Sequence, residues 1–142
     1  MNIKPVYTCL WFDDQAHEAA QFYCGIFKEG KILEESPIVT TFELNGTRFI
    51  GLNGGPKYVH SPAVSFVIEC DTQDEIDHYW DKLGEGGRYD MCGWLADKYG
   101  ISWQIIPSVL SQLMADTDKR ERVVQTFLKM QKFNIATLVE IK

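Results

Sequence analysis

The stretch VYTCLWFDDQ at residues 6–15 decides the fold, because VSFVIECDTQ at residues 64–73 repeats its pattern 58 positions later. In both copies alternating apolar residues, typical of a strand, lead into acidic or hydroxyl residues of the kind that begin helices. Apolar residues then recur at helical spacing, which predicts helices over about 15–27 and 73–83. Two strand–helix units at one offset predict a duplicated module.

The two predicted helices each have an expected cap and an expected buried stripe. Asp13 or Asp14 is expected to cap the first helix, and Asp71 or Thr72 the second. The buried stripes are expected to be Ala16, Ala19, Ala20, Tyr23 and Phe27 in the first helix, and Ile76, Tyr79, Trp80 and Leu83 in the second.

A hairpin is predicted between the two copies, following a short strand over 31–35. Asn45-Gly46 is a strong two-residue turn signal between strands 38–44 and 47–53, and its register sets Glu43 opposite Arg48 as an exposed ion pair. The face expected to pack on a helix carries Val39, Thr41, Ile50 and Leu52. The other face, either a ligand cavity or ordinary aromatic core, carries Thr40, Phe42, Phe49, Gly51 and Asn53.

The second copy is predicted to continue with strands over 89–95 and 101–106, and a third strand is left open. The rest of the chain is expected to be helical. Ser108 is expected to cap one helix, Asp118 and Glu121 to form a capping box for a second, and Asn134 to cap a third, where a strand is the alternative. We therefore expect one α+β domain over 1–142, with modules over about 1–60 and 61–107 and a helical tail over 108–142.

Composition excludes several classes of function. The 14 Lys and Arg against 20 Asp and Glu give a net charge of −6 and no basic patch, which argues against nucleic-acid partners. The longest uncharged run, residues 101–114, is interrupted by a proline and polar residues, so no membrane association is expected. The N-terminus has no signal-peptide layout, and the four cysteines lack the close spacing of a metal site. We expect a cytoplasmic protein with reduced thiols.

Several catalytic motifs are missing. Gly54-Gly55 follows a strand, but no G-x-G-x-x-G and no helix succeed it, and no G-x-S-x-G occurs. Cys9 or Cys92 as a nucleophile would need a nearby base, which the sequence does not place.

The motifs CLWFDDQA (9–16), FYCGIF (22–27), FELNGTRF (42–49), LNGGP (52–56) and CGWLADKYGISWQIIP (92–107) resemble the PhnB-like family. Its members are often catalogued as 3-demethylubiquinone-9 3-methyltransferase-like proteins of the vicinal oxygen chelate (glyoxalase/bleomycin-resistance) superfamily. The resemblance implies paired βαβββ modules whose sheets cup a small-molecule site, usually in a homodimer.

Metal enzymes of that superfamily typically carry one His on the first strand of each module and a Glu on a closing strand. An overlay sets Tyr7 and Ser65 at the histidine positions and Gln104 at the carboxylate position. These are weak, neutral ligands, so no metal is expected. The methyltransferase description implies S-adenosylmethionine, yet no glycine-rich turn follows the first strand, so no cofactor is expected either.

Strand parity supplies the candidate site. Tyr7, Cys9 and Trp11 share one face, Ser65, Val67 and Glu69 another, while Gln104 and Trp103 point to opposite sides. Glu69 would act as a base only if buried. The candidate ligand-binding residues are Tyr7, Cys9, Phe49, Asn53, Ser65, Glu69, Trp94 and Gln104.

The function expected is metal-free binding of a small organic molecule. The alternatives are a metal-dependent lyase, isomerase or transferase of the same superfamily, the catalogued methyltransferase activity, and a protein whose main role is dimer assembly.

Overall fold

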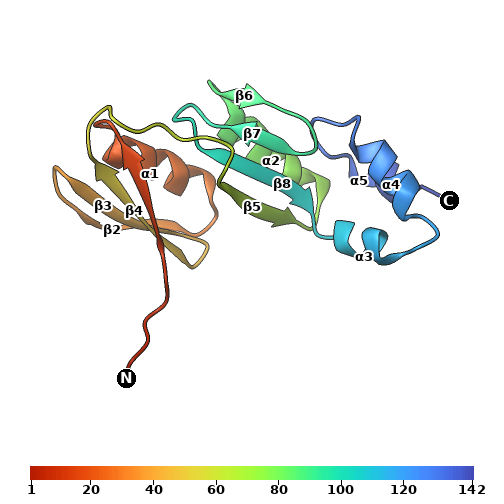
Figure 1. The fold of residues 1–142 in the computed structure, drawn as a ribbon, viewed down its shortest axis with the longest axis horizontal. Helices are drawn as coiled ribbons and strands as arrows, with labels where there is room; N and C mark the ends of the chain where they lie inside the picture. The colour runs from red at the N-terminus through yellow and green to blue at the C-terminus, as the bar shows by residue number, and fades with distance from the viewer. The chain divides into compact units, whose positions relative to one another are not determined.

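The computed structural model describes all 142 residues and divides them into two compact units, Met1–His60 and Ser61–Lys142 (Figure 1). The elements of the first unit are β1 (Thr8–Phe12), α1 (Ala16–Ile26), β2 (Gly30–Glu35), β3 (Val39–Leu44) and β4 (Thr47–Asn53). Those of the second are β5 (Ser65–Cys70), α2 (Gln73–Gly84), β6 (Arg88–Tyr89), β7 (Trp94–Ala96) and β8 (Ser102–Pro107), followed by α3 (Leu110–Ala115), α4 (Arg120–Phe127) and α5 (Ile135–Val139).

The two sheets have the same topology. Their strand orders are β1-β4-β3-β2 and β5-β8-β7-β6, and in each the first and last strands of the module pair in parallel while the others are antiparallel. The repeat at residues 6–15 and 64–73 is thus a structural duplication. The predicted α+β class, with two βαβββ modules and a helical tail, is confirmed. No helix has the length and apolar composition required to cross a bilayer.

Helix α1 packs on the face of the first sheet for which the sequence left two interpretations open, a ligand cavity or an ordinary aromatic core. Phe42 stacks on Tyr23 of α1 at a centroid distance of 6.1 Å and on Phe49 at 5.5 Å. A Cβ on Gly51 would lie 3.1 Å from the Cβ of Ala16, so a glycine allows the helix to approach this closely. The expectation that the face with Val39 and Ile50 packs on the helix was therefore wrong, and the other face is the aromatic core. The buried stripe of α1 is confirmed.

The hairpin register is as predicted, and the turn residues Asn45 and Gly46 have φ of 49° and 86°. Glu43 and Arg48 are register partners, but the predicted ion pair between them is wrong. Glu43 pairs instead with Lys31 at 3.5 Å, and the Arg48 guanidinium lies 4.6 Å from the centroid of the Tyr7 ring. On a sheet, a neighbouring strand competes for the same side chain.

The helix caps were predicted correctly only in the second module. Thr72 and Glu75 form a reciprocal capping box at the start of α2. Helix α1 begins after Gln15, which makes no side-chain cap, and the Ala16 N–H donates to Oδ1 of Asn53 at 2.9 Å. The expected Asp13 or Asp14 cap is replaced by a side chain from β4.

The strand predicted over 89–95 is interrupted. Cys92 and Gly93 have left-handed φ values of 59° and 78°, and their N–H groups donate to Met130 O at 2.7 Å and Gln131 O at 2.8 Å. The tail thus takes hydrogen bonds that a continuous strand would have given to its sheet. The break separates the two-residue β6 from β7, which supplies the third strand that the sequence left open.

Of the three helix caps predicted in the tail, two are wrong and one is confirmed. The Ser108 hydroxyl donates to Asp71 Oδ1 at 2.6 Å instead of capping α3, which has no side-chain cap. Helix α4 begins after Lys119 without a side-chain cap, so the box between Asp118 and Glu121 is wrong. Asn134 caps α5 as expected, accepting from the Thr137 N–H at 3.0 Å.

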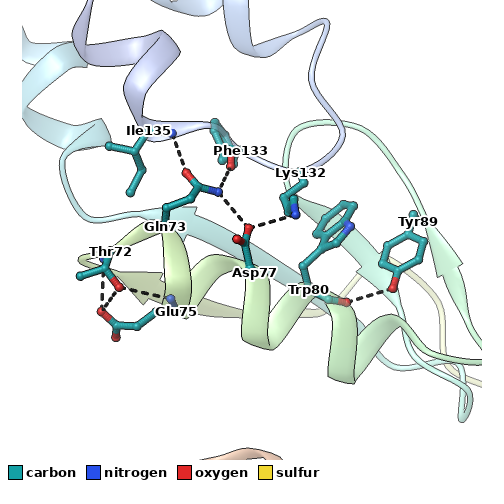
Figure 2. Close-up of polar contacts among 9 residues, drawn as sticks. All are labelled: Thr72, Gln73, Glu75, Asp77, Trp80, Tyr89, Lys132, Phe133 and Ile135. Carbon is teal, nitrogen blue, oxygen red and sulfur yellow. Dashed lines mark hydrogen bonds and ion pairs between the residues drawn. The ribbon is translucent and has the colours of Figure 1, made fainter.

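Gln73 at the start of α2 holds the tail (Figure 2). Its Nε2 donates to Phe133 O at 2.9 Å and to Asp77 Oδ1 at 3.1 Å, while its Oε1 accepts from the Ile135 N–H at 2.9 Å. Asp77 also pairs with Lys132 at 2.9 Å. Because Phe133 and residues of α4 and α5 are fully buried, the tail is part of the core of the second unit.

Candidate functional site

Each sheet has one face covered by its module helix and one opposite face, which we call its open face. In the second unit, Trp103 and Ile105 are buried on the helix side. Their neighbours Val67 and Gln104, which are register partners, point to the open face, where Val67 is 52% exposed. The predicted alternation of Gln104 and Trp103 is confirmed by this pattern.

A polar pair lies on the open face of the second sheet. Gln104 Nε2 donates to Ser65 Oγ at 2.9 Å, across the parallel pair β5 and β8. This bond leaves the Gln104 amide oxygen as an acceptor and the Ser65 hydroxyl proton as a donor. Trp94 is the register partner of Gln104 on the other side, so an aromatic ring flanks the polar pair. Three candidate residues from three strands are therefore brought together.

Glu69 lies on the same open face, two positions along β5 from Val67, and its side chain is exposed. Burial was the condition for a role as a base, and it is not met. Glu69 is therefore available to bind a polar ligand group rather than to abstract a proton.

The open face of the first sheet carries Cys9 and Trp11 from β1. The Trp11 indole N–H donates to Gly55 O at 2.8 Å, and Tyr58 meets the ring edge-on at a centroid distance of 4.9 Å. Partial burial raises the pKa of the Cys9 thiol, so it stays protonated at neutral pH and is a poor nucleophile. Sequence reasoning did not select Tyr58 as a candidate. The only feature of the sequence that could have pointed to it is its position soon after Gly54-Gly55.

Two predicted site residues lie on the helix side of the first sheet instead of its open face. Phe49 is buried against Phe42, and both functional groups of the Asn53 amide bind backbone, the oxygen at Ala16 N and the nitrogen at Pro37 O. Both positions follow from the reversed hairpin faces. Tyr7 points to the open side, beneath Arg48.

The residues at the superfamily's metal positions do not fit a metal ion. Tyr7 carries a cation over its ring, and Gln104 and Ser65 are neutral groups bonded to one another. A Zn²⁺ or Ni²⁺ ion prefers imidazole, thiolate or carboxylate ligands. No three His, Cys, Asp or Glu side chains gather to form an alternative cluster.

The turn after β1 does not fit S-adenosylmethionine bound in the manner of a doubly wound fold. That turn carries Asp13 and Asp14 in place of glycines, and the first N–H of the following helix is already bonded to Asn53. The sheets are also mixed rather than parallel.

Comparisons with known proteins agree with this fold. The sequence profile of the family described as 3-demethylubiquinone-9 3-methyltransferase matches residues 4–106. A PhnB protein from Bacillus cereus, whose name carries the same family description, is 31% identical to this chain. The alignment covers 74% of this chain and 100% of the PhnB protein, with a TM-score of 0.67.

More distant solved structures share the fold alone. The fosfomycin resistance protein FosX from Mesorhizobium loti is 12% identical to this chain. The alignment covers 81% of this chain and 100% of FosX, with a TM-score of 0.60. A glyoxalase/bleomycin resistance protein from Albidiferax ferrireducens is 12% identical, with coverages of 72% and 97% and a TM-score of 0.53. No curated protein matches the chain. The chain belongs to the 3-demethylubiquinone-9 3-methyltransferase family, whose description the similar PhnB protein also carries.

Proposed function

We propose that this protein binds a small organic molecule on the open face of the second sheet, without a metal ion. The observation that carries the proposal is the hydrogen bond between Gln104 and Ser65 beside Trp94. A hydrogen-bonded pair of polar side chains on the open face does not contribute to the packing of the sheet against its helix. Such pairs are what orient a ligand in a mostly apolar site.

The three residues suit a ligand with one polar group on a planar apolar body. The Gln104 oxygen accepts a hydrogen bond, the Ser65 hydroxyl donates one, and both lie next to an indole that can stack on a ring. Val67, on the same face and 52% exposed, offers apolar contact. Glu69 adds a negative group that favours a ligand hydroxyl or amine over an acid at that end.

The methyltransferase reaction is the second candidate, and it rests on the family description matched by residues 4–106. It requires a methyl donor, and the turn after β1 offers no site for one in the usual form. A metal-dependent enzyme of the superfamily would need ligands other than Tyr7, Ser65 and Gln104. The proposed form is a homodimer, supported by the exposed apolar side chains on the sheets, such as Val67 of β5 and Leu33 of β2.

Thermal melting of the purified protein tests these functions against one panel. The panel holds Ni²⁺, Zn²⁺ and Mn²⁺, S-adenosylmethionine, and aromatic and thiol-conjugated small molecules. A ligand at 100 times its Kd stabilises by about 2.7 kcal/mol, which raises Tm by roughly 5–10 °C for a chain of this size. A shift with organic molecules alone supports the proposal. A shift with a metal or the methyl donor overturns it in favour of an enzyme.

A pair of variants then locates the site. Gln104→Leu removes the polar pair and is expected to weaken an organic ligand about ten-fold, because the ligand loses a hydrogen bond and Ser65 loses a partner. Gln112→Leu makes the same change at an exposed position of α3 and is expected to bind like the wild type. Equal affinity in both variants would remove Gln104 from the site. A dimer that binds nothing on the panel would leave assembly as the role of the sheets.

A further inference from the structure

We propose a second binding site, in the first unit, for an organic anion that carries a carboxylate or phosphate group. The site is a cavity of about 680 Å³ between the N-terminal segment 4–7 and the end of the hairpin at 46–48. Its cationic groups are Lys4 and Arg48. It belongs to a different unit from the site of the proposed function and does not rest on it.

The size of the cavity suits a small organic molecule. Ligand pockets are typically about 300–1,000 Å³, and this one falls in the middle of that range. It is a depression open to solvent, because all seven residues that line it are exposed. Two sides of different character bound it. Pro5 and Val6 are apolar, and Val6 is 99% exposed, whereas the hairpin end contributes Gly46 and Thr47 with small or polar side chains.

The lining of the cavity is positively charged, whereas the protein as a whole is negatively charged. The chain has a net charge of −6, yet the lining contains Lys4 and Arg48 and no carboxylate. The carboxylate directly opposite Arg48 on the sheet is Glu43, its register partner, and it pairs with Lys31 at 3.5 Å. Neither Arg48 nor Lys4 takes part in the ion pairs of His17, Lys31, Arg88 and Lys132 with carboxylates. Both cations are left for a ligand.

Arg48 is also held in place. Its guanidinium lies over the Tyr7 ring, 4.6 Å from the centroid, and its backbone belongs to β4 just after the tight Asn45-Gly46 turn. The contact with the ring uses no N–H group of Arg48, so its N–H groups remain available, and they match the two oxygens of a carboxylate or phosphate. A pre-oriented cation loses less freedom when it binds an anion. The geometry therefore favours an oxyanion head at Arg48 and an apolar body against segment 4–7.

Isothermal titration calorimetry with simple probes tests this site. Phenyl phosphate and benzoate both place an oxyanion on an aromatic body, inorganic phosphate has the head alone, and benzylamine has the body with the opposite charge. We expect saturable binding of phenyl phosphate and benzoate that weakens as salt rises, weaker binding of phosphate, and none of benzylamine. Whichever of phenyl phosphate and benzoate binds more tightly identifies the preferred head group as phosphate or carboxylate.

Matched variants assign the binding to this cavity. Arg48→Met keeps an unbranched apolar stem but removes the guanidinium. It is expected to lower affinity for the better organic anion at least ten-fold, since charge-assisted bonds are lost. Arg122→Met makes the same change on the exposed surface of α4 and is expected to leave affinity unchanged. Backbone amide shifts on titration should concentrate at residues 46–48.

Either of two results would overturn the inference. One is no saturable binding of phenyl phosphate or benzoate at tens of millimolar. The other is equal affinity in the Arg48→Met and Arg122→Met variants. Failure here is distinguishable from failure of the proposed function, because Gln104→Leu affects only the second sheet and is expected to leave anion affinity unchanged.

Discussion

Replacement of Gln73 by leucine is expected to release the tail from α2 and to cost about 2–4 kcal/mol of unfolding free energy. The variant orphans Phe133 O and Ile135 N, which the Gln73 amide now satisfies at 2.9 Å each (Figure 2). Both groups are partly buried, and a buried polar group without a partner costs about 1–3 kcal/mol. The third bond, to Asp77, is closer to solvent and adds little.

Urea denaturation followed by circular dichroism measures the loss, which corresponds to a fall in Tm of about 5–15 °C. Hydrogen exchange at the Ile135 amide localises it, because that N–H loses its acceptor. Gln125→Leu is the matched control. Gln125 sits on exposed α4 with a long 3.5 Å contact to Glu121, and its replacement should change stability by less than about 0.5 kcal/mol.

Intermediate behaviour is expected of Gln73→Glu, which keeps the acceptor for Ile135 but loses both donated bonds and adds a charge beside Asp77. The reasoning fails if Gln73→Leu is destabilised by less than about 1 kcal/mol. It also fails if exchange at Ile135 is as slow as in the wild type, since the tail would then be held by its apolar contacts alone.

Three further outcomes follow from single contacts. Gly93→Ala should lower stability by at least about 2 kcal/mol in the same urea assay, because φ is +78° and the new Cβ would meet Ile105 O at 2.5 Å; a loss below about 0.5 kcal/mol would show that the turn can shift freely. Asn53→Ala should cost about 1 kcal/mol by removing the acceptor of the Ala16 N–H, whereas Asn53→Asp should retain most of that stability. Burial raises the pKa of Cys70 to about 12, so a thiolate-specific reagent at pH 8 should label it in urea but hardly at all in the folded protein, with the folded rate rising as pH rises; equal rates in the two states would contradict that shift.

The duplicated module was readable from the sequence because its signals are local. A strand period, a helical stripe and a turn dipeptide each depend on residues a few positions apart, and α1, α2 and the Asn45-Gly46 hairpin all appeared where those signals lie. The helix cap at Asp71 or Thr72 was equally local, and the structure places it at Thr72. The break at Cys92 was missed because its hydrogen bonds go to Met130 and Gln131, far along the chain.

Only one aspect of the candidate site could be predicted from the sequence, namely which residues share a strand face. Alternation along a strand says which residues share a face, and it correctly grouped Ser65 with Val67 and separated Gln104 from Trp103. It does not say which of the two faces a helix covers. On the first sheet α1 covers the aromatic face, which places Phe49 in the core and Asn53 against the start of α1.

What the sequence by itself determined is therefore most of the strands and helices, with the division of β6 from β7 as the exception, and the residues that share each strand face. Only the tertiary structure decided which face each helix covers, which distant group caps α1, and that Arg48 stacks on Tyr7 instead of pairing with Glu43. The physical reason is that periodicity and turn chemistry act within a few residues. The partner of a polar or charged side chain is chosen by competition among all the groups that folding brings near it.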